Sequence, residues 1–212
     1  MVLESQYLHY LSALIDGKKD ECTRIILSLL DNGVPVKEIY TNVIKRSMYR
    51  IGQLWENDRT SIAREHQATK ITEIIINIIY PYILKVPKIE KKVIVTCTDK
   101  EFHELGARMV SDVFELNGWN SIYLGANTPK DELIKLIEEE KPNLVAISLN
   151  FYINIVRLMK EIELINEKFP DLQIIVGGQA FNDGNEEILH KYKNVKYISC
   201  LYSLEEFIKE QG

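Results

Sequence analysis

The sequence predicts an α/β protein, in which a four-helix bundle precedes a five-stranded parallel sheet with helices on both faces. Two observations predict this class. Apolar residues recur at helical spacing over the first 84 residues, and from residue 91 short β-rich runs alternate with helical patterns. The expected organisation is a helical cap over residues 1–84, a linker over 85–90 and an α/β domain over 91–212.

The first part is expected to form four helices with short joints, which favours a small antiparallel bundle. Gly17 and Gly33 follow the first two helical patterns, where glycine commonly ends a helix. Pro81 and Pro87 are expected to end the bundle. The four predicted helices cover residues 7–15, 22–30, about 35–55 and about 61–80.

The second part repeats strand and helix, as parallel βαβ units do. The predicted strands cover residues 93–98, 121–124, 144–148, 173–176 and 195–199, and the predicted helices cover 105–117, 130–140, 153–168, 186–191 and 204–209. Five strands in this length suit the flavodoxin-like order 2-1-3-4-5, in which ligands bind where the first and third strands meet. The loops after the first, third and fourth strands are therefore expected to rim one crevice.

Composition and short patterns narrow the function classes. A net charge of -5 argues against direct nucleic-acid binding, which depends on Lys and Arg. The longest apolar run, residues 74–84, is too short to cross a membrane, and a secretory signal is not expected because no basic segment precedes an apolar stretch near Met1. The cysteines form no CxxC pair, which argues against disulfides or structural zinc and favours a cytoplasmic location. No Ser-His-Asp order or HExxH pattern is present, so autonomous catalysis is not expected.

The most informative motif is Glu101-x-His103-x-x-Gly106, directly after the first predicted strand. Imidazole is a good ligand for transition metals, cobalt among them, and a carboxylate two residues away can fix its tautomer. Gly106 would let a bulky group approach the backbone. The alternative is that His103 is a surface histidine at a helix start and that Glu101 is a solvated carboxylate.

Two further loops carry small or polar residues. Ser148 follows the third predicted strand, and Gly177-Gly178 follows the fourth. Ser148 can cap the next helix or hydrogen-bond a ligand in the crevice. The glycines can form a plain turn, or they can let a flat or extended ligand lie against bare backbone. The phosphate-binding patterns GxGxxG and GxxxxGK(S/T) are absent, which weakens a nucleotide interpretation.

A second constellation is Trp55 followed, after nine residues, by Glu65-His66. Trp55 continues the apolar stripe of its helix, so the default expectation is a core tryptophan. His66 falls away from the stripe through Ile71 and Ile74, so packing does not require an imidazole there. The helix dipole favours Glu65 in a first turn. The three side chains are expected near one end of the bundle.

Taken together, these residues resemble the cobalamin-binding module, a helical-bundle cap followed by a flavodoxin-like domain. The resemblance covers nearly the whole chain. The family pattern is Asp/Glu-x-His-x-x-Gly, a serine after the third strand and Gly-Gly after the fourth. The resemblance implies that His103 replaces the dimethylbenzimidazole of cobalamin as the lower cobalt ligand. It further implies that the displaced nucleotide tail runs against Ser148, Gly177 and Gly178.

The Trp-x9-Glu-His pattern resembles the light-sensing adenosylcobalamin regulators of the CarH/LitR type and the related AerR antirepressors. That resemblance implies that Trp55 and Glu65 contact the upper adenosyl group between the cap and the α/β domain. Light would break the cobalt–carbon bond, and His66 would take the vacated cobalt position. Unlike CarH, this sequence shows no helix-turn-helix domain, so regulation is expected through a protein partner or homo-oligomerisation.

Three functions are therefore weighed. The first is a photosensory regulator that holds adenosylcobalamin. The alternative is a corrinoid carrier, with methylcobalamin, that shuttles methyl groups between methyltransferases; it needs the His103 motif but has no evident use for His66. The third is an interaction module without a cofactor. A protein partner is expected in each case, and neither nucleic acid nor membrane is.

Overall fold

The computed structural model describes residues 1–182 and 184–211, and the chain divides into two compact units. The first unit is Met1–Lys85, and the second begins at Val86. Each unit has its own buried core. Among the described residues, no helix combines the length and the apolar character that crossing a bilayer requires.

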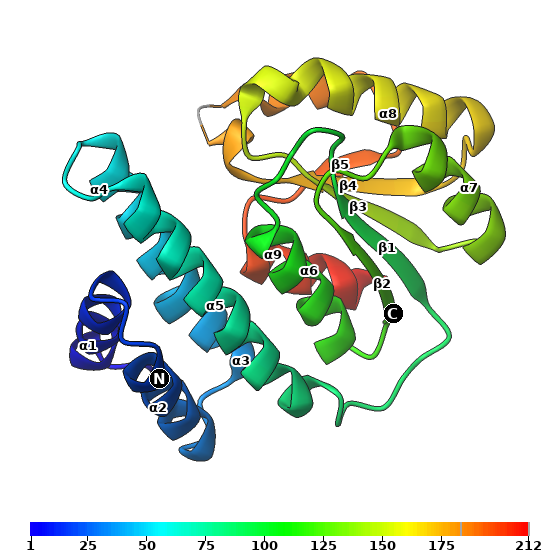
Figure 1. Ribbon diagram of the computed structural model, residues 1–212. Helices are drawn as coiled ribbons and strands as arrows, with labels where there is room; N and C mark the ends of the chain where they lie inside the picture. The colour runs from blue at the N-terminus through cyan, green and yellow to red at the C-terminus, as the bar shows by residue number, and fades with distance from the viewer. Residues whose placement is uncertain (183, 212) are drawn as a thin grey trace. The chain divides into compact units, whose positions relative to one another are not determined.

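The first unit is entirely helical (Figure 1). Its elements are α1 (Glu4–Ile15), α2 (Lys19–Asp31), α3 (Val36–Ile39), the π-helical η1 (Tyr40–Lys45), α4 (Arg46–Glu56) and α5 (Ile62–Ile83). Because α3, η1 and α4 follow one another without a break, they form the third of the four predicted helices. Tyr10, Ile26, Tyr40 and Ile75 are fully buried where these helices pack together.

Helix α5 departs from the prediction at its end, because it continues through Pro81 to Ile83. Proline costs a helix one hydrogen bond and some steric strain. Pro81 itself is exposed, whereas Ile79 and Ile83 are fully buried, and their burial offsets that cost. The buried stripe also runs differently from the expected one, since Ile74 is exposed.

The second unit is built on a five-stranded parallel sheet in the order β2-β1-β3-β4-β5, which confirms the predicted fold class. The strands are β1 (Lys92–Cys97), β2 (Asn120–Gly125), β3 (Leu144–Ser148), β4 (Gln173–Gly177) and β5 (Val195–Tyr197). The α-helices are α6 (Leu105–Leu116), α7 (Lys130–Glu140), α8 (Ile155–Lys168) and α9 (Leu201–Glu210). Three 3-10 segments complete the unit: η2 (Tyr152–Asn154), η3 (Gln179–Phe181) and η4 (Asn185–Leu189).

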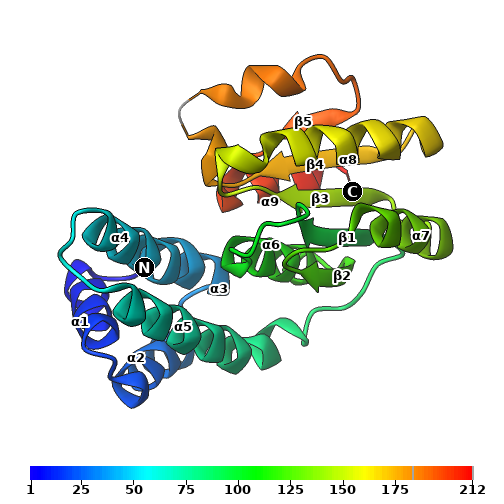
Figure 2. The same ribbon diagram turned by 45° about the horizontal axis from the view of Figure 1, so that its top comes forward.

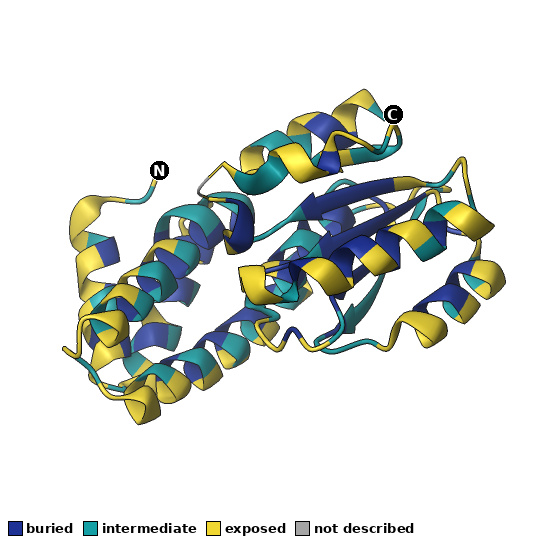
Figure 3. Cartoon of the chain, turned by 90° about the horizontal axis from the view of Figure 1, so that it is seen from above, coloured by how far each residue is buried: buried dark blue, intermediate teal, exposed yellow. Residues whose placement is uncertain are grey.

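Helices cover both faces of this sheet, α7 and α8 on one side and α6 and α9 on the other (Figures 1 and 2). Successive residues of the central strands point to opposite faces of the sheet, and both sets are therefore buried, as is typical of a parallel sheet. Ile94, Val145 and Ile174 pack against α7 and α8 in one continuous core. Figure 3 shows the result, with dark-blue central strands between helices whose outer faces are exposed.

The prediction of a helix over residues 186–191 is wrong, because this segment forms only the 3-10 turn η4. Leu189 is the one buried residue of η4. A single buried side chain gives the segment no apolar stripe, and without such a stripe tertiary packing stabilises a short helix poorly.

Candidate functional site

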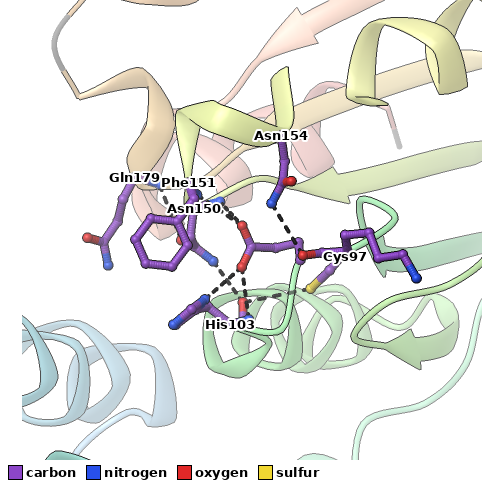
Figure 4. Close-up of polar contacts among 8 residues, drawn as sticks. Cys97, His103, Asn150, Phe151, Asn154 and Gln179 are labelled. Atoms are coloured by element: carbon purple, nitrogen blue, oxygen red, sulfur yellow. Dashed lines mark hydrogen bonds and ion pairs between the residues drawn. The ribbon is translucent and has the colours of Figure 1, made fainter. Parts of the chain in front are cut away.

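The three loops singled out from the sequence begin side by side at the carboxyl edge of the sheet. The register pairs Cys97 with Ser148, and Ser148 with Gly177, so β1, β3 and β4 end at the same level. Asn150 then joins the loops that follow. Its Nδ2 donates to the carbonyl of His103 at 2.7 Å, and its Oδ1 accepts from the backbone N–H of Gln179 at 3.3 Å (Figure 4).

Glu101 is the centre of this arrangement and is 0% exposed, so it is not a solvated carboxylate. Its Oε1 lies 2.7 Å from Nδ1 of His103 and accepts the His103 backbone N–H at 3.0 Å. Its Oε2 accepts the backbone N–H groups of Asn150 at 3.1 Å and Phe151 at 2.9 Å. One side chain therefore fastens the loop after β1 to the loop after β3.

The protonation states follow from these contacts. Burial raises the pKa of Glu101, but the hydrogen bonds from the His103 ring and from three backbone N–H groups outweigh burial and bring the pKa to about 2. An ionised carboxylate can only accept, so Nδ1 of His103 carries a proton, and Nε2 is the ring nitrogen that remains to meet a metal. Metal-binding histidines typically donate the N–H of their other ring nitrogen to a carboxylate in this way.

The His103 ring is accessible as well as oriented. Its side chain is 56% exposed, and Phe151 packs edge-on against it with ring centroids 4.6 Å apart. A Cβ placed on Gly106 would meet no atom within 4 Å, so this helix start leaves room for an approaching group.

These residues fit a metal that arrives already held by its own macrocycle. Across the part of the chain that is described, no group of three or more His, Cys, Asp or Glu could hold a bare metal ion. A corrinoid supplies the equatorial ligands itself and needs one protein nitrogen, which is what the carboxylate-oriented imidazole of His103 offers.

Gly178 has a structural reason to be glycine. Its φ is +116°, and a Cβ there would overlap the carbonyl oxygen of Leu149, so the loops after β3 and β4 pack backbone to backbone. Gly177 is also confined, because its Cβ would lie 2.9 Å from the carbonyl oxygen of Ile198. Ser148 does not cap a helix; its carbonyl accepts the Thr98 backbone N–H. Contact of these three residues with a ligand stays a prediction.

Trp55, Glu65 and His66 all lie in the first unit, on either side of the turn between α4 and α5. The expectation that Trp55 is a core residue was wrong, because Trp55 is 42% exposed. It lies at the tip of this turn, where residues 55–59 are all exposed. His66 is 68% exposed, as its position off the stripe predicts. Its Nδ1 lies 2.7 Å from Oε2 of Glu65, which repeats the carboxylate–imidazole contact of the second unit.

Sequence reasoning missed part of the site. It did not place Asn150 among the site residues, whereas Asn150 bridges three loops. It passed over Phe151 and over Asn127, whose Oδ1 accepts the Lys100 backbone N–H. It also passed over Glu161, which binds the same loop from α8. The one available signal was for Glu161, a carboxylate on the apolar face of its helix.

Comparison with protein families matches both units. A family model described as the B12 binding domain matches residues 91–207, and a second model with the same description matches residues 9–80. No curated protein matches the sequence significantly.

Solved structures show the same fold. The monomethylamine corrinoid protein of Methanosarcina barkeri has a TM-score of 0.86 and 14% identity, covering 99% of each chain. The methanol:cobalamin methyltransferase complex MtaBC from Methanosarcina barkeri has a TM-score of 0.53 and 13% identity, over 99% of this chain and 80% of that one. A cobalamin-binding protein from Desulfitobacterium hafniense DCB-2 has a TM-score of 0.52 and 15% identity, over 96% and 97%.

Proposed function

Because this chain belongs to the B12-binding domain family and is therefore a cobalamin-binding protein, we propose that it is a corrinoid carrier that serves methyltransferases. The observation that supports coordination of cobalt by a protein side chain is the contact between the buried Glu101 carboxylate and Nδ1 of His103, at 2.7 Å. Support for the carrier role comes from two structures of like fold, named a monomethylamine corrinoid protein and a methanol:cobalamin methyltransferase complex.

Several residues of the second unit would hold the corrinoid, each in a different way. His103 would bind cobalt from below through Nε2, and Glu101 would hold the proton on Nδ1 and so keep the ring basic. Asn150 would keep the His103 loop against the loop after β3. Ser148, Gly177 and Gly178 would line the path of the nucleotide tail. The bound corrinoid would supply a cobalt centre that accepts and releases a methyl group, so we propose the methylated form as the working cofactor.

The ligand assignment is tested with His103→Ala and, as a matched control, His190→Ala, an exposed histidine of the same unit. Each full-length variant is labelled with 15N-histidine and loaded with cob(II)alamin. Its electron paramagnetic resonance spectrum is then recorded, in which a 15N doublet from a protein histidine is distinct from the 14N triplet of the cofactor's own base. We expect nitrogen splitting from the protein in the wild type and in His190→Ala, and its loss in His103→Ala. Splitting that survives in His103→Ala would show that another residue binds the cobalt.

The carrier role is tested by methyl exchange. The cofactor on the loaded chain is reduced, and its methylation by the host's corrinoid methyltransferases, supplied with methylamine or methanol, is followed by absorbance. We expect transfer to the wild type to be faster than to free cobalamin at equal concentration. Equal rates with every methyltransferase would contradict the carrier role.

A light-responsive regulator is the second candidate, and the Glu65–His66 contact favours it. The exposed His66 and its half-buried partner Glu65 have no evident use in a carrier, and the Nδ1–Oε2 distance of 2.7 Å orients the imidazole for metal binding. The test compares dark and illuminated spectra and gel-filtration profiles of the protein loaded with adenosylcobalamin, for the wild type and His66→Ala. If illumination changes the wild type and His66→Ala alters the illuminated product, regulation by light is favoured. Identical dark and illuminated profiles would exclude it.

A further inference from the structure

A second buried carboxylate binds the loop that carries His103, and the proposed function does not use it. Glu161 lies on α8 and is 2% exposed. Its Oε1 accepts the backbone N–H of Asp99 at 2.7 Å, at the start of the loop over residues 98–104. An ionisable side chain that is buried away from its own helix's solvent face needs a reason to be there.

We propose that Glu161 is a positioning residue for the His103 loop. When Glu161 takes up a proton from solvent, the loop is held less firmly and His103 coordinates cobalt less well. This inference rests on the proposed role of His103 as the lower ligand. Glu161 contacts the loop through the backbone N–H of Asp99 and would act through that contact.

The loop is fastened at several places, among them Lys100 by Asn127 and His103 by Asn150, and Glu161 provides the contact at its start. Glu101 ties its middle to the loop after β3. At its start, Glu161 binds the Asp99 backbone, and Arg157 pairs with the Asp99 carboxylate at 2.8 Å. An N–O distance of 2.7 Å is within the range of roughly 2.7–2.9 Å for charge-assisted hydrogen bonds, which are about twice as strong as neutral ones. Protonation of Glu161 would therefore weaken this anchor.

The surroundings of Glu161 make such a proton exchange accessible. Burial raises the pKa of Glu161 to about 7, against the lowering effect of the Asp99 N–H, the Thr98 hydroxyl and Arg157. The Asp99 carboxylate raises it further, and the Cys97 thiol of β1 also faces this group.

The structure also offers an acceptor for the added proton. Oε2 of Glu161 and Oγ1 of Thr98 are both buried, and within the described residues neither has a partner in good hydrogen-bond geometry. The Thr98 hydroxyl nevertheless lies near enough to affect the carboxyl. A proton on Oε2 could be donated to Oγ1, so the neutral form is accommodated without a new unsatisfied group.

The test measures the 15N splitting from His103 in 15N-histidine-labelled protein with bound cob(II)alamin, as a function of pH from about pH 5.5 to about pH 9. It compares the wild type with Glu161→Gln, Arg157→Gln and the control Glu163→Gln, an exposed carboxylate of the same helix. We expect the His-coordinated fraction of the wild type and of Glu163→Gln to rise through neutral pH. Glu161→Gln should stay at the low-pH level throughout. Arg157→Gln should move the transition to higher pH, because a charge that lowers the pKa of Glu161 is removed.

The possible failures are distinguishable. A wild type without splitting at any pH would overturn the role of His103 and this inference with it. Splitting that is independent of pH, or whose transition persists unchanged in Glu161→Gln, would overturn the inference and leave His103 as the ligand. If Glu161→Gln does not fold, the exposed Arg157→Gln decides, since an unmoved transition would also overturn the inference.

Discussion

Glu101 is the side chain on which the geometry of the site depends most. It is fully buried and accepts hydrogen bonds from the His103 ring and from backbone groups of two loops. Its effect on His103 is local and electrostatic, whereas its effect on the loops is structural. Both effects require a charged acceptor at this position, so an isosteric neutral group should harm both.

We predict that Glu101→Gln lowers the free energy of unfolding of the second unit by about 3 kcal/mol, because the new NH2 group faces backbone donors. Urea unfolding followed by the fluorescence of Trp119, which is buried in this unit, measures the change. Glu163→Gln serves as the control and should change stability little. A loss of stability no larger than in Glu163→Gln would show that the buried hydrogen bonds contribute little.

A second prediction concerns Gly178, where steric overlap and backbone strain coincide. Gly178→Ala should lower the free energy of unfolding by at least about 2 kcal/mol more than Gly184→Ala does. Gly184 also has a positive φ, +79°, but a Cβ there meets nothing within 4 Å, so it isolates the strain alone. Equal losses in the two variants would mean that the loops after β3 and β4 can separate at little cost.

At the scale of the elements, helix α5 shows how tertiary burial overrides a local stop signal. Pro81 was expected to end the helix, yet the chain continues helically to Ile83 because Ile83 is buried. The same competition explains η4, where too few buried side chains support a helix. The third predicted helix was found in place, but its π-helical segment η1 had no signal in the periodicity.

The cost of Pro81 can be measured. Pro81→Ala restores a backbone N–H in the last turn of α5 and should raise the free energy of unfolding of the first unit by about 1 kcal/mol. Thermal unfolding followed by circular dichroism detects the change. Pro87→Ala, at an exposed site outside any helix, should give no gain. A gain in both variants, or in neither, would contradict this explanation.

For the whole molecule, the acidic chain contains one carboxylate whose ionisation opposes folding. The pKa of Glu161 in the folded state is about 7, above the reference value of 4.5. The folded state therefore binds this proton more tightly than the unfolded state. The stabilisation is fully present below the unfolded pKa and is lost as the pH rises through the folded pKa.

We therefore predict that the free energy of unfolding of the wild type falls by about 2 kcal/mol, relative to that of Glu161→Gln, when the pH is raised from about 5 to about 8. Urea unfolding of the cofactor-free protein at both values checks this. Glu163→Gln should remain parallel to the wild type. If the difference between Glu161→Gln and the wild type is the same at both pH values, the buried carboxylate does not titrate in this window.

Much of the fold and part of the site could be predicted. Strand β3 and helix α7 were predicted to the residue, because a short apolar run marks the strand and Pro129 directly precedes the helix. The motif residues Glu101 and His103 were identified because loops after parallel strands gather at one edge. Glu161 and Asn150 could not be found in the same way, since their role depends on which distant backbone groups they reach.

The sequence by itself determined the order of the elements, the parallel sheet and the residues offered to a corrinoid, because periodicity and loop position are local properties. Only the tertiary structure decided which carboxylates are buried, that Trp55 is exposed and that Gly178 is needed for loop packing. The physical reason is that burial and hydrogen bonding depend on groups far apart along the chain. The ionisation of Glu101 and Glu161, which differ in pKa within one site, is the clearest example.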